Sequence, residues 1–252
     1  MNVGLIQYNP VWEDKKANHK QLEALLEDGA VDTSLLIFPE MSLTGFTMAS
    51  LKHAEQLDGE TVQFFSSIAR NFDCHVIAGI IEAASPLPHN SLIHLKPDGN
   101  LVSTYRKIHT ISYYSEHQHY QKGTEPTVTA VEHIKIGLSI CFDLRFPELY
   151  RSYIDQKVHA MINIANWPAA RAQHWEALLR ARAIENQCYM IGVNRIGTDD
   201  NIQFDGHSTI IDPLGNELIL KEKKEGVFTV DISAEMVTEV RASFPVLNLR
   251  VI

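Results

Sequence analysis

Short apolar runs rich in valine and isoleucine recur along the whole chain, and segments with helical spacing separate them. Apolar runs of this length are typical of strands that are buried on both faces of a sheet. Between the runs, apolar residues around Leu22, Phe65 and Leu178 recur at the helical period, which predicts amphipathic helices, the first ending at Gly29. This alternation predicts sheets covered by helices, a layered α/β fold. The predicted strands cover residues 3–8, 35–38, 75–80, 134–140, 160–165 and 189–193.

Two hairpins are predicted in addition to these buried strands. In each of them two short apolar runs flank a turn that contains Pro, Asp and Gly, which are the residues that favour tight turns. A chain that combines such hairpins with buried parallel strands is predicted to form a mixed sheet. The paired runs are 90–95 with 101–106 and 209–211 with 217–220, and a further strand is predicted at 227–230.

Composition excludes several classes of protein. The chain has 22 Lys and Arg residues against 31 Asp and Glu residues, a formal net charge of −9, and no basic run, so no nucleic-acid partner is expected. The amino terminus lacks the features of a secretory signal, and no stretch approaches the roughly 20 apolar residues that cross a membrane. Three cysteines make no disulfide framework. We therefore expect a soluble cytoplasmic protein, with residues 1–252 forming one domain.

Glu40 lies where a buried strand ends. Pro39 stops the apolar run at 35–38, and the carboxylate follows it at once, beside apolar Phe38, Met41 and Phe46. Removal from water would raise the pKa of such a carboxyl toward the range that is useful for proton transfer near neutrality. The alternative is a loop glutamate that faces water.

Lys107 and Cys141 also follow predicted strands. The Lys107 ammonium is suited to stabilise an oxyanion, although a lysine after Arg106 is also typical of a solvated surface. Cys141 follows an apolar strand and precedes a predicted helix at 148–153, where the helix amino end would favour a thiolate. The alternative is a buried structural cysteine, which is our interpretation of Cys74 and Cys188, each at the start of an apolar strand.

Together, Phe-Pro-Glu at 38–40, Tyr-Arg-Lys at 105–107 and Cys-Phe-Asp-Leu-Arg-Phe-Pro-Glu at 141–148 resemble the Glu, Lys and Cys motifs of the nitrilase superfamily of carbon–nitrogen hydrolases. The resemblance extends over essentially the whole chain and implies a four-layer αββα sandwich, commonly dimerised. Glu116, shortly before an aromatic residue and a glycine, matches a second family glutamate that is expected to orient the substrate or Lys107. The segment 166–187 is similar to the bacterial omega-amidase branch.

The resemblance also implies a reaction that uses neither a metal nor an organic cofactor. Cys141 would attack the carbon of a small amide while Glu40 takes the thiol proton, and Lys107 with the Phe142 N–H would hold the oxyanion. Water would then hydrolyse the thioester, which makes water and a small amide the expected partners. Omega-amidases act on 2-oxoglutaramate and 2-oxosuccinamate, whose carboxylate needs a partner in the protein.

Three further residues are candidates for substrate binding. Arg145 would bind the substrate carboxylate, or it would instead brace the helix against Glu148. Asn166 and Trp167 follow the strand at 160–165 and are expected to line the pocket, although a tryptophan at a strand end often caps the core. The apolar tail at 244–249 would pack on a second subunit or close its own core.

Other functions remain as alternatives. Within the same superfamily they are a deaminated-glutathione amidase and, more remotely, a nitrile hydrolase. A catalytically silent binding scaffold belongs to a different class. Metal-dependent hydrolysis by His117, His119 and His207 is disfavoured, because these residues lack the spacing of a known metal motif.

Overall fold

Two β-sheets dominate the computed structural model, which describes residues 1–28, 32–199, 202–219 and 223–250. The first has six strands in the order β13-β1-β2-β3-β4-β5, and the second has five in the order β12-β9-β8-β7-β6. The first contains β1 (Asn2–Gln7), β2 (Leu35–Ile37), β3 (His75–Glu82), β4 (His89–Leu95), β5 (Leu101–Arg106) and β13 (Gly226–Asp231). The second contains β6 (Val128–Val131), β7 (Ile134–Ile140), β8 (Ala160–Ala165), β9 (Tyr189–Asn194) and β12 (Thr209–Ile211), while β10 (Ile196–Asp199) pairs with β11 (Ile202–Asp205).

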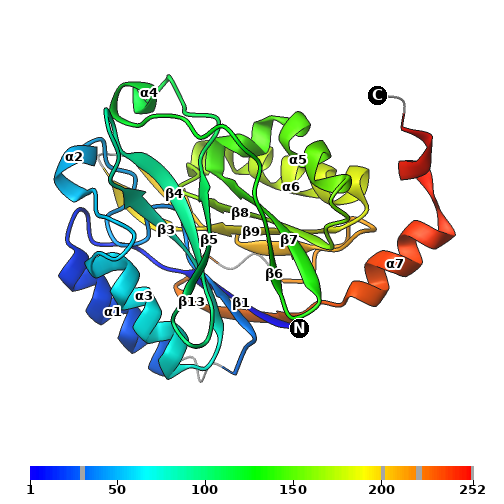
Figure 1. Ribbon diagram of the computed structural model, residues 1–252, viewed down its shortest axis with the longest axis horizontal. Helices are drawn as coiled ribbons and strands as arrows, with labels where there is room; N and C mark the ends of the chain where they lie inside the picture. The colour runs from blue at the N-terminus through cyan, green and yellow to red at the C-terminus, as the bar shows by residue number, and fades with distance from the viewer. Residues whose placement is uncertain (29–31, 200–201, 220–222, 251–252) are drawn as a thin grey trace.

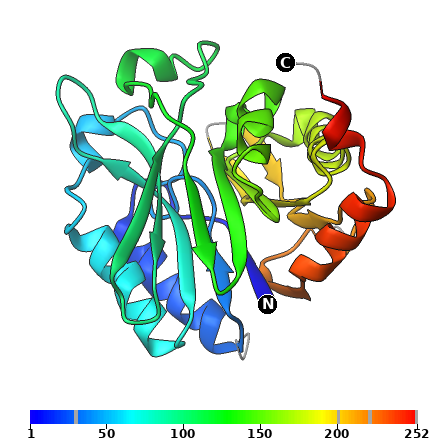
Figure 2. The same cartoon turned by 45° about the vertical axis from the view of Figure 1, so that its right-hand side comes forward.

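Helices cover the outer face of each sheet (Figure 1). Figure 2 shows the sheets packed face to face between the blue and cyan helices α1 and α3 on one side and the green and yellow helices α5 and α6 on the other. The predicted four-layer αββα sandwich is therefore confirmed. The helices are α1 (Lys15–Asp28), α2 (Ser50–His53), α3 (Glu60–Asn71), α4 (Glu116–His119), α5 (Pro147–Ile154), α6 (Ala172–Asn186) and α7 (Ala234–Ser243).

The central strands β1 and β2 of the first sheet are largely apolar because both of their faces are buried. In β1, Val3 and Leu5 belong to the core between the two sheets, whereas Ile6 belongs to the core beneath the helices. In β2, Leu35 and Ile37 point toward the second sheet while Leu36 packs on the helical side. Side chains alternate between the faces of a strand, so two buried faces require an uninterrupted apolar run.

Most of the predicted elements are present. The six predicted buried strands correspond to β1, β2, β3, β7, β8 and β9, and β4 pairs with β5 in an antiparallel hairpin. The turn of the second hairpin also forms, since Asp212 N–H donates to Asn216 O at 2.8 Å. The prediction of a strand at 217–220 is wrong for the described part of that range. There the β-pairing is limited to an isolated bridge between Glu217 and Ile211. Residue 220 and Gly29 lie outside the described residues.

The parallel strands bring the candidate residues to one end of the sandwich. Strands β1, β2 and β3 run parallel in the first sheet, and β7, β8 and β9 run parallel in the second. Glu40 follows β2, Cys141 follows β7 and Asn166 follows β8, so three carboxyl-terminal strand ends supply the site. Within the described ranges, no helix combines the length and apolar character needed to cross a membrane.

Candidate active site

The backbone around Glu40 is held tightly against the neighbouring strand. A Cβ atom at Gly79 would lie 2.7 Å from the Cα of Glu40 and 2.4 Å from the Met41 nitrogen, so only glycine permits this approach. Ser42 N–H donates to Gly79 O at 2.9 Å, and Met41 has a φ of 45°. Glu40 itself is 1% exposed and is not a loop residue that faces water.

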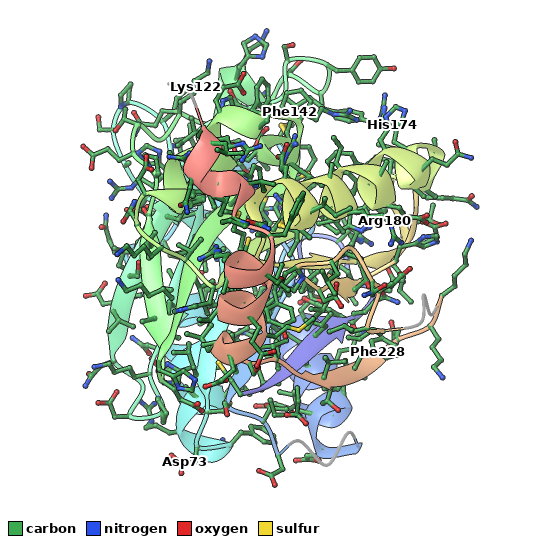
Figure 3. All side chains as sticks on the ribbon, turned by 90° about the vertical axis from the view of Figure 1, so that its right-hand side faces the viewer. Asp73, Lys122, Phe142, His174, Arg180 and Phe228 are labelled. Atoms are coloured by element: carbon green, nitrogen blue, oxygen red, sulfur yellow. The ribbon has the colours of Figure 1, made fainter. Side chains whose placement is uncertain are left out.

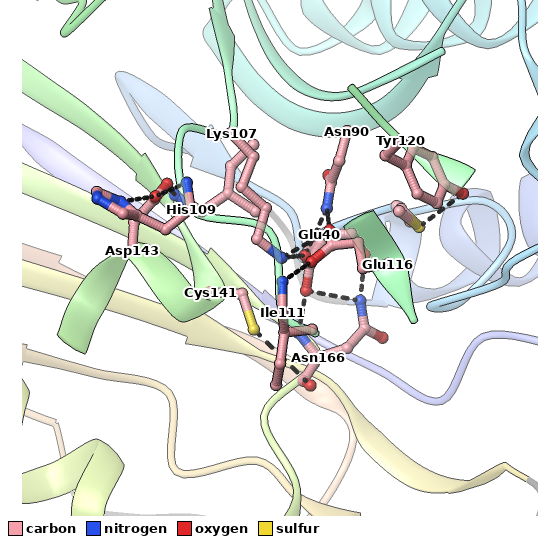
Figure 4. Close-up of polar contacts among 12 residues, drawn as sticks. Glu40, Asn90, Lys107, His109, Ile111, Glu116, Tyr120, Cys141, Asp143 and Asn166 are labelled. Atoms are coloured by element: carbon pink, nitrogen blue, oxygen red, sulfur yellow. Dashed lines mark hydrogen bonds and ion pairs between the residues drawn. The ribbon is translucent and has the colours of Figure 1, made fainter. Parts of the chain in front are cut away.

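One buried lysine lies between two buried carboxylates (Figure 4). Lys107 Nζ is 2.9 Å from Glu40 Oε1 and 2.9 Å from Glu116 Oε1. Asn90 Nδ2 donates to the same two oxygens, at 2.7 and 2.9 Å. Lys107 is 1% exposed, so it is not part of the solvated surface. Of the two roles expected of Glu116, the structure shows the contact with Lys107.

The balance of burial and neighbouring charge separates the two carboxylates. Burial alone would raise the pKa of Glu40, but Lys107 and the hydrogen bonds from Asn90 and Asn166 hold it below its usual range. The predicted rise in the Glu40 pKa is therefore wrong. Burial raises the pKa of Glu116, because the effect of Lys107 there is countered by the charge of Glu40. Although burial opposes its charge, Lys107 has a pKa well above the usual range, owing to Glu116 and Glu40.

Cys141 lies on a sharp elbow between β7 and a 3₁₀-helix at Cys141–Arg145 that leads into α5. Its φ of 46° is in the left-handed region, which costs a residue other than glycine about 1–3 kcal/mol. Asp143 supports the elbow, because its carboxylate accepts hydrogen bonds from Ile140 N–H at 3.0 Å and Tyr105 Oη at 2.7 Å. The other oxygen accepts from His109 N–H at 2.9 Å, which ties the elbow to the segment after Lys107.

The resting thiol of Cys141 keeps its proton. Burial and then the Glu40 charge raise the thiol pKa well above its usual value, and Lys107 offsets this only in part. The prediction that the helix amino end would favour a thiolate is therefore wrong for the resting site. Burial also raises the pKa of Cys74 and of Cys188 to about 12. Both thiols are buried, as expected of core cysteines.

Asn166 connects the end of β8 to the carboxylate. Its backbone N–H donates to Glu40 Oε2 at 2.8 Å, and its Nδ2 donates to the Glu40 carbonyl at 2.7 Å. The next residue, Trp167, is 3% exposed, and its ring centroid lies 5.4 Å from that of Trp175. Both Asn166 and Trp167 line the cavity described next, and Trp167 also packs in the core.

A cavity of about 370 Å³ opens beside the thiol. Its walls include Cys141, Phe142, Arg145, Asn166 and Trp167, whereas Glu40, Lys107 and Glu116 do not line it. The Arg145 guanidinium carbon is 4.7 Å from the centroid of the Trp167 ring. Among the residues that the structure describes, Arg145 forms no ion pair with a carboxylate, so it does not brace the helix through Glu148.

Several further residues around this cavity are not marked by any motif in the sequence. Asn90 contacts both carboxylates, but the sequence shows it only as a polar residue at the start of a predicted strand. Arg171, Tyr113 and Tyr114 also line the cavity. The two tyrosines lie in a connecting segment without periodicity, and a pattern of apolar spacing does not place such a segment in space.

The histidines weighed as metal ligands lie in separate places. His117 and His119 are in α4, whereas His207 Nε2 is 3.2 Å from Asp205 Oδ2. In the described part of the chain, no group of three or more His, Cys, Asp or Glu side chains is arranged to hold a metal ion.

Comparison with known proteins places the chain in a family. The family model for carbon-nitrogen hydrolases matches residues 2–242. The chain belongs to the carbon-nitrogen hydrolase family. This confirms the resemblance to the nitrilase superfamily that its three motifs indicated.

Two curated relatives of this hydrolase carry names that state an activity. It is 36% identical to a 2-oxoglutaramate amidase of Paenarthrobacter nicotinovorans, over 89% of this chain and 81% of the relative. It is 34% identical to the omega-amidase YafV of Yersinia enterocolitica, over 98% of this chain and 96% of the relative. A solved structure, a CN-hydrolase superfamily protein from Xanthomonas campestris with an arsenic adduct in its active site, is 33% identical. It matches with a TM-score of 0.94 over 100% of this chain and 97% of its own.

Proposed function

We propose that this hydrolase is an omega-amidase that releases ammonia from the monoamides of 2-oxo dicarboxylic acids, 2-oxoglutaramate and 2-oxosuccinamate. The observation that carries the proposal is one cavity that holds both the Cys141 thiol and an arginine without a carboxylate partner among the described residues. The thiol suits attack on an amide, and the guanidinium suits the carboxylate at the other end of the same small molecule. The names of the two relatives support this choice of substrate.

The first half of the proposed reaction forms a thioester. Glu40 carries a negative charge and accepts the thiol proton, and the Cys141 sulfur attacks the amide carbon. The negative charge then develops on the amide oxygen, where the Lys107 ammonium and the Phe142 N–H stabilise it. Collapse of the tetrahedral intermediate breaks the C–N bond, and the proton held by Glu40 passes to the nitrogen, so ammonia leaves.

The second half of the reaction regenerates the thiol. Glu40, again ionised, takes a proton from water, whose oxygen attacks the thioester carbon. The same two donors stabilise the new oxyanion, and the C–S bond breaks as the proton on Glu40 returns to the Cys141 sulfur. In this proposal Glu116 positions Lys107, because its Oε1 accepts a hydrogen bond from the ammonium at 2.9 Å.

A panel of substrates tests the proposed function. Ammonia release is measured from 2-oxoglutaramate, 2-oxosuccinamate, deaminated glutathione, glutamine and a simple nitrile, with and without a strong chelator. We expect the largest kcat/KM with one of the two 2-oxo acid amides and no loss with chelator. A largest value with deaminated glutathione would instead support the related amidase, and no ammonia from any compound would support a binding scaffold.

Arg145→Ala tests recognition of the carboxylate. A hydrogen bond to a charged group contributes about 1.5–3 kcal/mol, so we expect kcat/KM for 2-oxoglutaramate to fall by about 10- to 100-fold. An uncharged linear amide makes no such contact and should lose much less. Steady-state ammonia assays with both compounds decide the matter: an equal loss for both would reject charge recognition by Arg145.

We also propose that the protein is a single-domain homodimer of the cytoplasm. Residues 1–252 form one catalytic domain, which the family match over 2–242 supports. The carboxyl-terminal segment, orange to red in Figure 1, runs along one side of the molecule and leaves Phe244 67% and Leu249 79% exposed. Exposed apolar side chains of this kind support a homodimer that covers them. The free thiols of Cys74, Cys141 and Cys188 support a reducing cytoplasm.

A further inference from the structure

Two arginines line the cavity beside Cys141. Arg145 Nη2 lies 3.4 Å from His174 Nδ1, and Arg171 Nη1 donates to Tyr114 Oη at 3.3 Å. A guanidinium has five N–H donors in a rigid fork, so each arginine has donors to spare. Among the described residues, neither guanidinium has a carboxylate within ion-pair distance.

Acidic residues outnumber basic ones by 31 to 22 in this chain, and several of its other arginines pair with carboxylates. Arg106 pairs with Glu82, and Arg182 Nη1 is 2.9 Å from Glu185 Oε1. At the cavity, by contrast, burial and then the charge of Arg171 lower the pKa of Arg145, and Cys141 offsets this only in part, so the two guanidinium charges repel each other. An anion bound between them would relieve this repulsion.

The position of Arg171 connects the cavity to the catalytic carboxylates. Arg171 ends the short 3₁₀-helix at Ala169–Arg171, and its guanidinium carbon lies 5.4 Å from the centroid of the Tyr113 ring. Tyr113 and Tyr114 belong to the segment that begins at Ile111, whose N–H donates to Glu116 Oε2 at 2.7 Å. Arg171 therefore holds the tyrosine wall of the cavity while its remaining donors are available to a ligand.

We infer that Arg171, supported by Tyr114, completes a carboxylate-binding subsite whose other half is Arg145. This subsite selects amides that carry a carboxylate at the end remote from the scissile bond, and it also binds the dicarboxylate product. The inference rests on the proposed function and deepens it, since it assigns the specificity for the charged end to a second residue. Arg171 acts in binding, and the bond-breaking steps stay with Cys141 and Glu40.

Steady-state kinetics of matched variants provide the first test. Arg171→Gln, Arg171→Lys and Tyr114→Phe are compared on 2-oxoglutaramate and on pentanamide, a neutral amide of the same chain length. We expect Arg171→Gln to reduce kcat/KM for 2-oxoglutaramate by about 10- to 100-fold, mainly through KM, and to change the value for pentanamide by less than about threefold. Arg171→Lys should retain part of the selectivity, and Tyr114→Phe should show a smaller loss with the same preference.

Arg180→Gln is the control variant. Arg180 is another arginine of the same region of the chain, but it pairs with Glu217 at 3.7 Å and does not line the cavity. Figure 3 shows it further along α6 than His174 and away from Phe142. We expect this variant to keep its selectivity. Equal losses of kcat/KM for both amides in Arg171→Gln and in Tyr114→Phe would mean that Arg171 only supports the tyrosine wall, and would overturn the inference.

Binding of 2-oxoglutarate to the Cys141→Ala protein provides a test without turnover. Calorimetry should show binding that weakens by about 10-fold or more in Cys141→Ala/Arg171→Gln and that is unchanged in Cys141→Ala/Arg180→Gln. If the enzyme hydrolyses 2-oxoglutaramate but Arg171 does not affect the binding of 2-oxoglutarate, the inference fails and the proposed function stands. If 2-oxoglutarate binds through Arg171 but no 2-oxo acid amide is hydrolysed, the subsite stands and the proposed function fails.

Discussion

Replacing Cys141 with alanine is expected to abolish ammonia release from every amide substrate while the protein remains folded. Without the sulfur no thioester forms, and loss of a catalytic nucleophile reduces kcat by at least about four orders of magnitude. Alanine keeps the Cβ atom, so the elbow at a φ of 46° is not made harder to form. Ammonia release and the circular dichroism spectrum, measured on the same preparation, test both parts of the prediction.

The other two cysteines serve as controls for Cys141. Cys74 is buried, its pKa is raised to about 12, and it lies outside the cavity. Cys74→Ala is therefore expected to lose some stability through a small cavity and to keep its turnover. Undiminished turnover in Cys141→Ala would show that Cys141 is not the nucleophile, whatever the result with Cys74→Ala.

Replacing Lys107 with methionine is expected to reduce both activity and stability strongly. The variant keeps a side chain of similar length but leaves Glu40 and Glu116 buried without the ammonium that lies 2.9 Å from each of them. Removing one partner of a buried ion pair costs about 3–5 kcal/mol of folding free energy. The loss of the proposed oxyanion donor should also reduce kcat by at least about 10²-fold. Urea unfolding and ammonia assays measure the two effects.

The loss of stability in Lys107→Met should depend on pH, with a defined sign. In the native protein the pKa of Glu40 is lowered, so its contribution to stability is present above the unfolded pKa and is lost as the pH falls through the folded one. In the variant only the hydrogen bonds from Asn90, Asn166 and the Ile111 N–H still oppose the effect of burial. We therefore expect the pKa of Glu40 and Glu116 to rise, so that the folded state binds protons more readily than the unfolded state. The variant should therefore become less stable as the pH rises above the ordinary glutamate pKa of about 4.3.

Urea unfolding of the variant at about pH 5 and about pH 8 tests this sign. We expect the difference in unfolding free energy between native protein and variant to be larger at the higher pH. Lys135→Met is the matched control, because Lys135 is exposed on β7 and its removal leaves no buried carboxylate. A difference that is the same at both pH values would show that the ammonium does not compensate the two carboxylates.

Much of the fold followed from the sequence because burial on two faces leaves a clear pattern. The run at 134–140 became β7, and the hairpin at 90–106 became β4 and β5. Over its described residues, the strand predicted at 217–220 is absent for a local reason. The Asp212 carboxylate accepts hydrogen bonds from Leu214 N–H and Asn216 N–H, so the turn is stable by itself. Turn chemistry of this kind does not determine how many residues pair beyond the turn.

The candidate site was predictable in its composition and less so in its electrostatics. Three motifs identified Glu40, Lys107 and Cys141, and the structure brings these side chains together. The pKa prediction for Glu40 had the wrong sign because apolar neighbours in the sequence indicate burial but not the contacts with Lys107, Asn90 and Asn166. The pKa prediction for Cys141 had the wrong sign because it considered the helix amino end and not burial or the charge of Glu40. Asn90 illustrates the difficulty, since it contacts Glu40 from a position 50 residues further along the chain.

The division of the site between the two sheets has a mechanical consequence. Glu40 and Lys107 follow strands of the six-stranded sheet, whereas Cys141 and Asn166 follow strands of the five-stranded one. Packed side chains from both sheets form the layer between them. In the proposed reaction a proton passes from the Cys141 sulfur to the Glu40 carboxylate, and a displacement of about 1 Å between reacting groups can reduce a rate by about 10²-fold. A substitution that repacks the layer between the sheets should therefore change the alignment of Glu40 with Cys141, even when the substituted residue lies far from the sulfur. The core between the sheets thus supports the geometry of the proposed reaction as well as the stability of the fold.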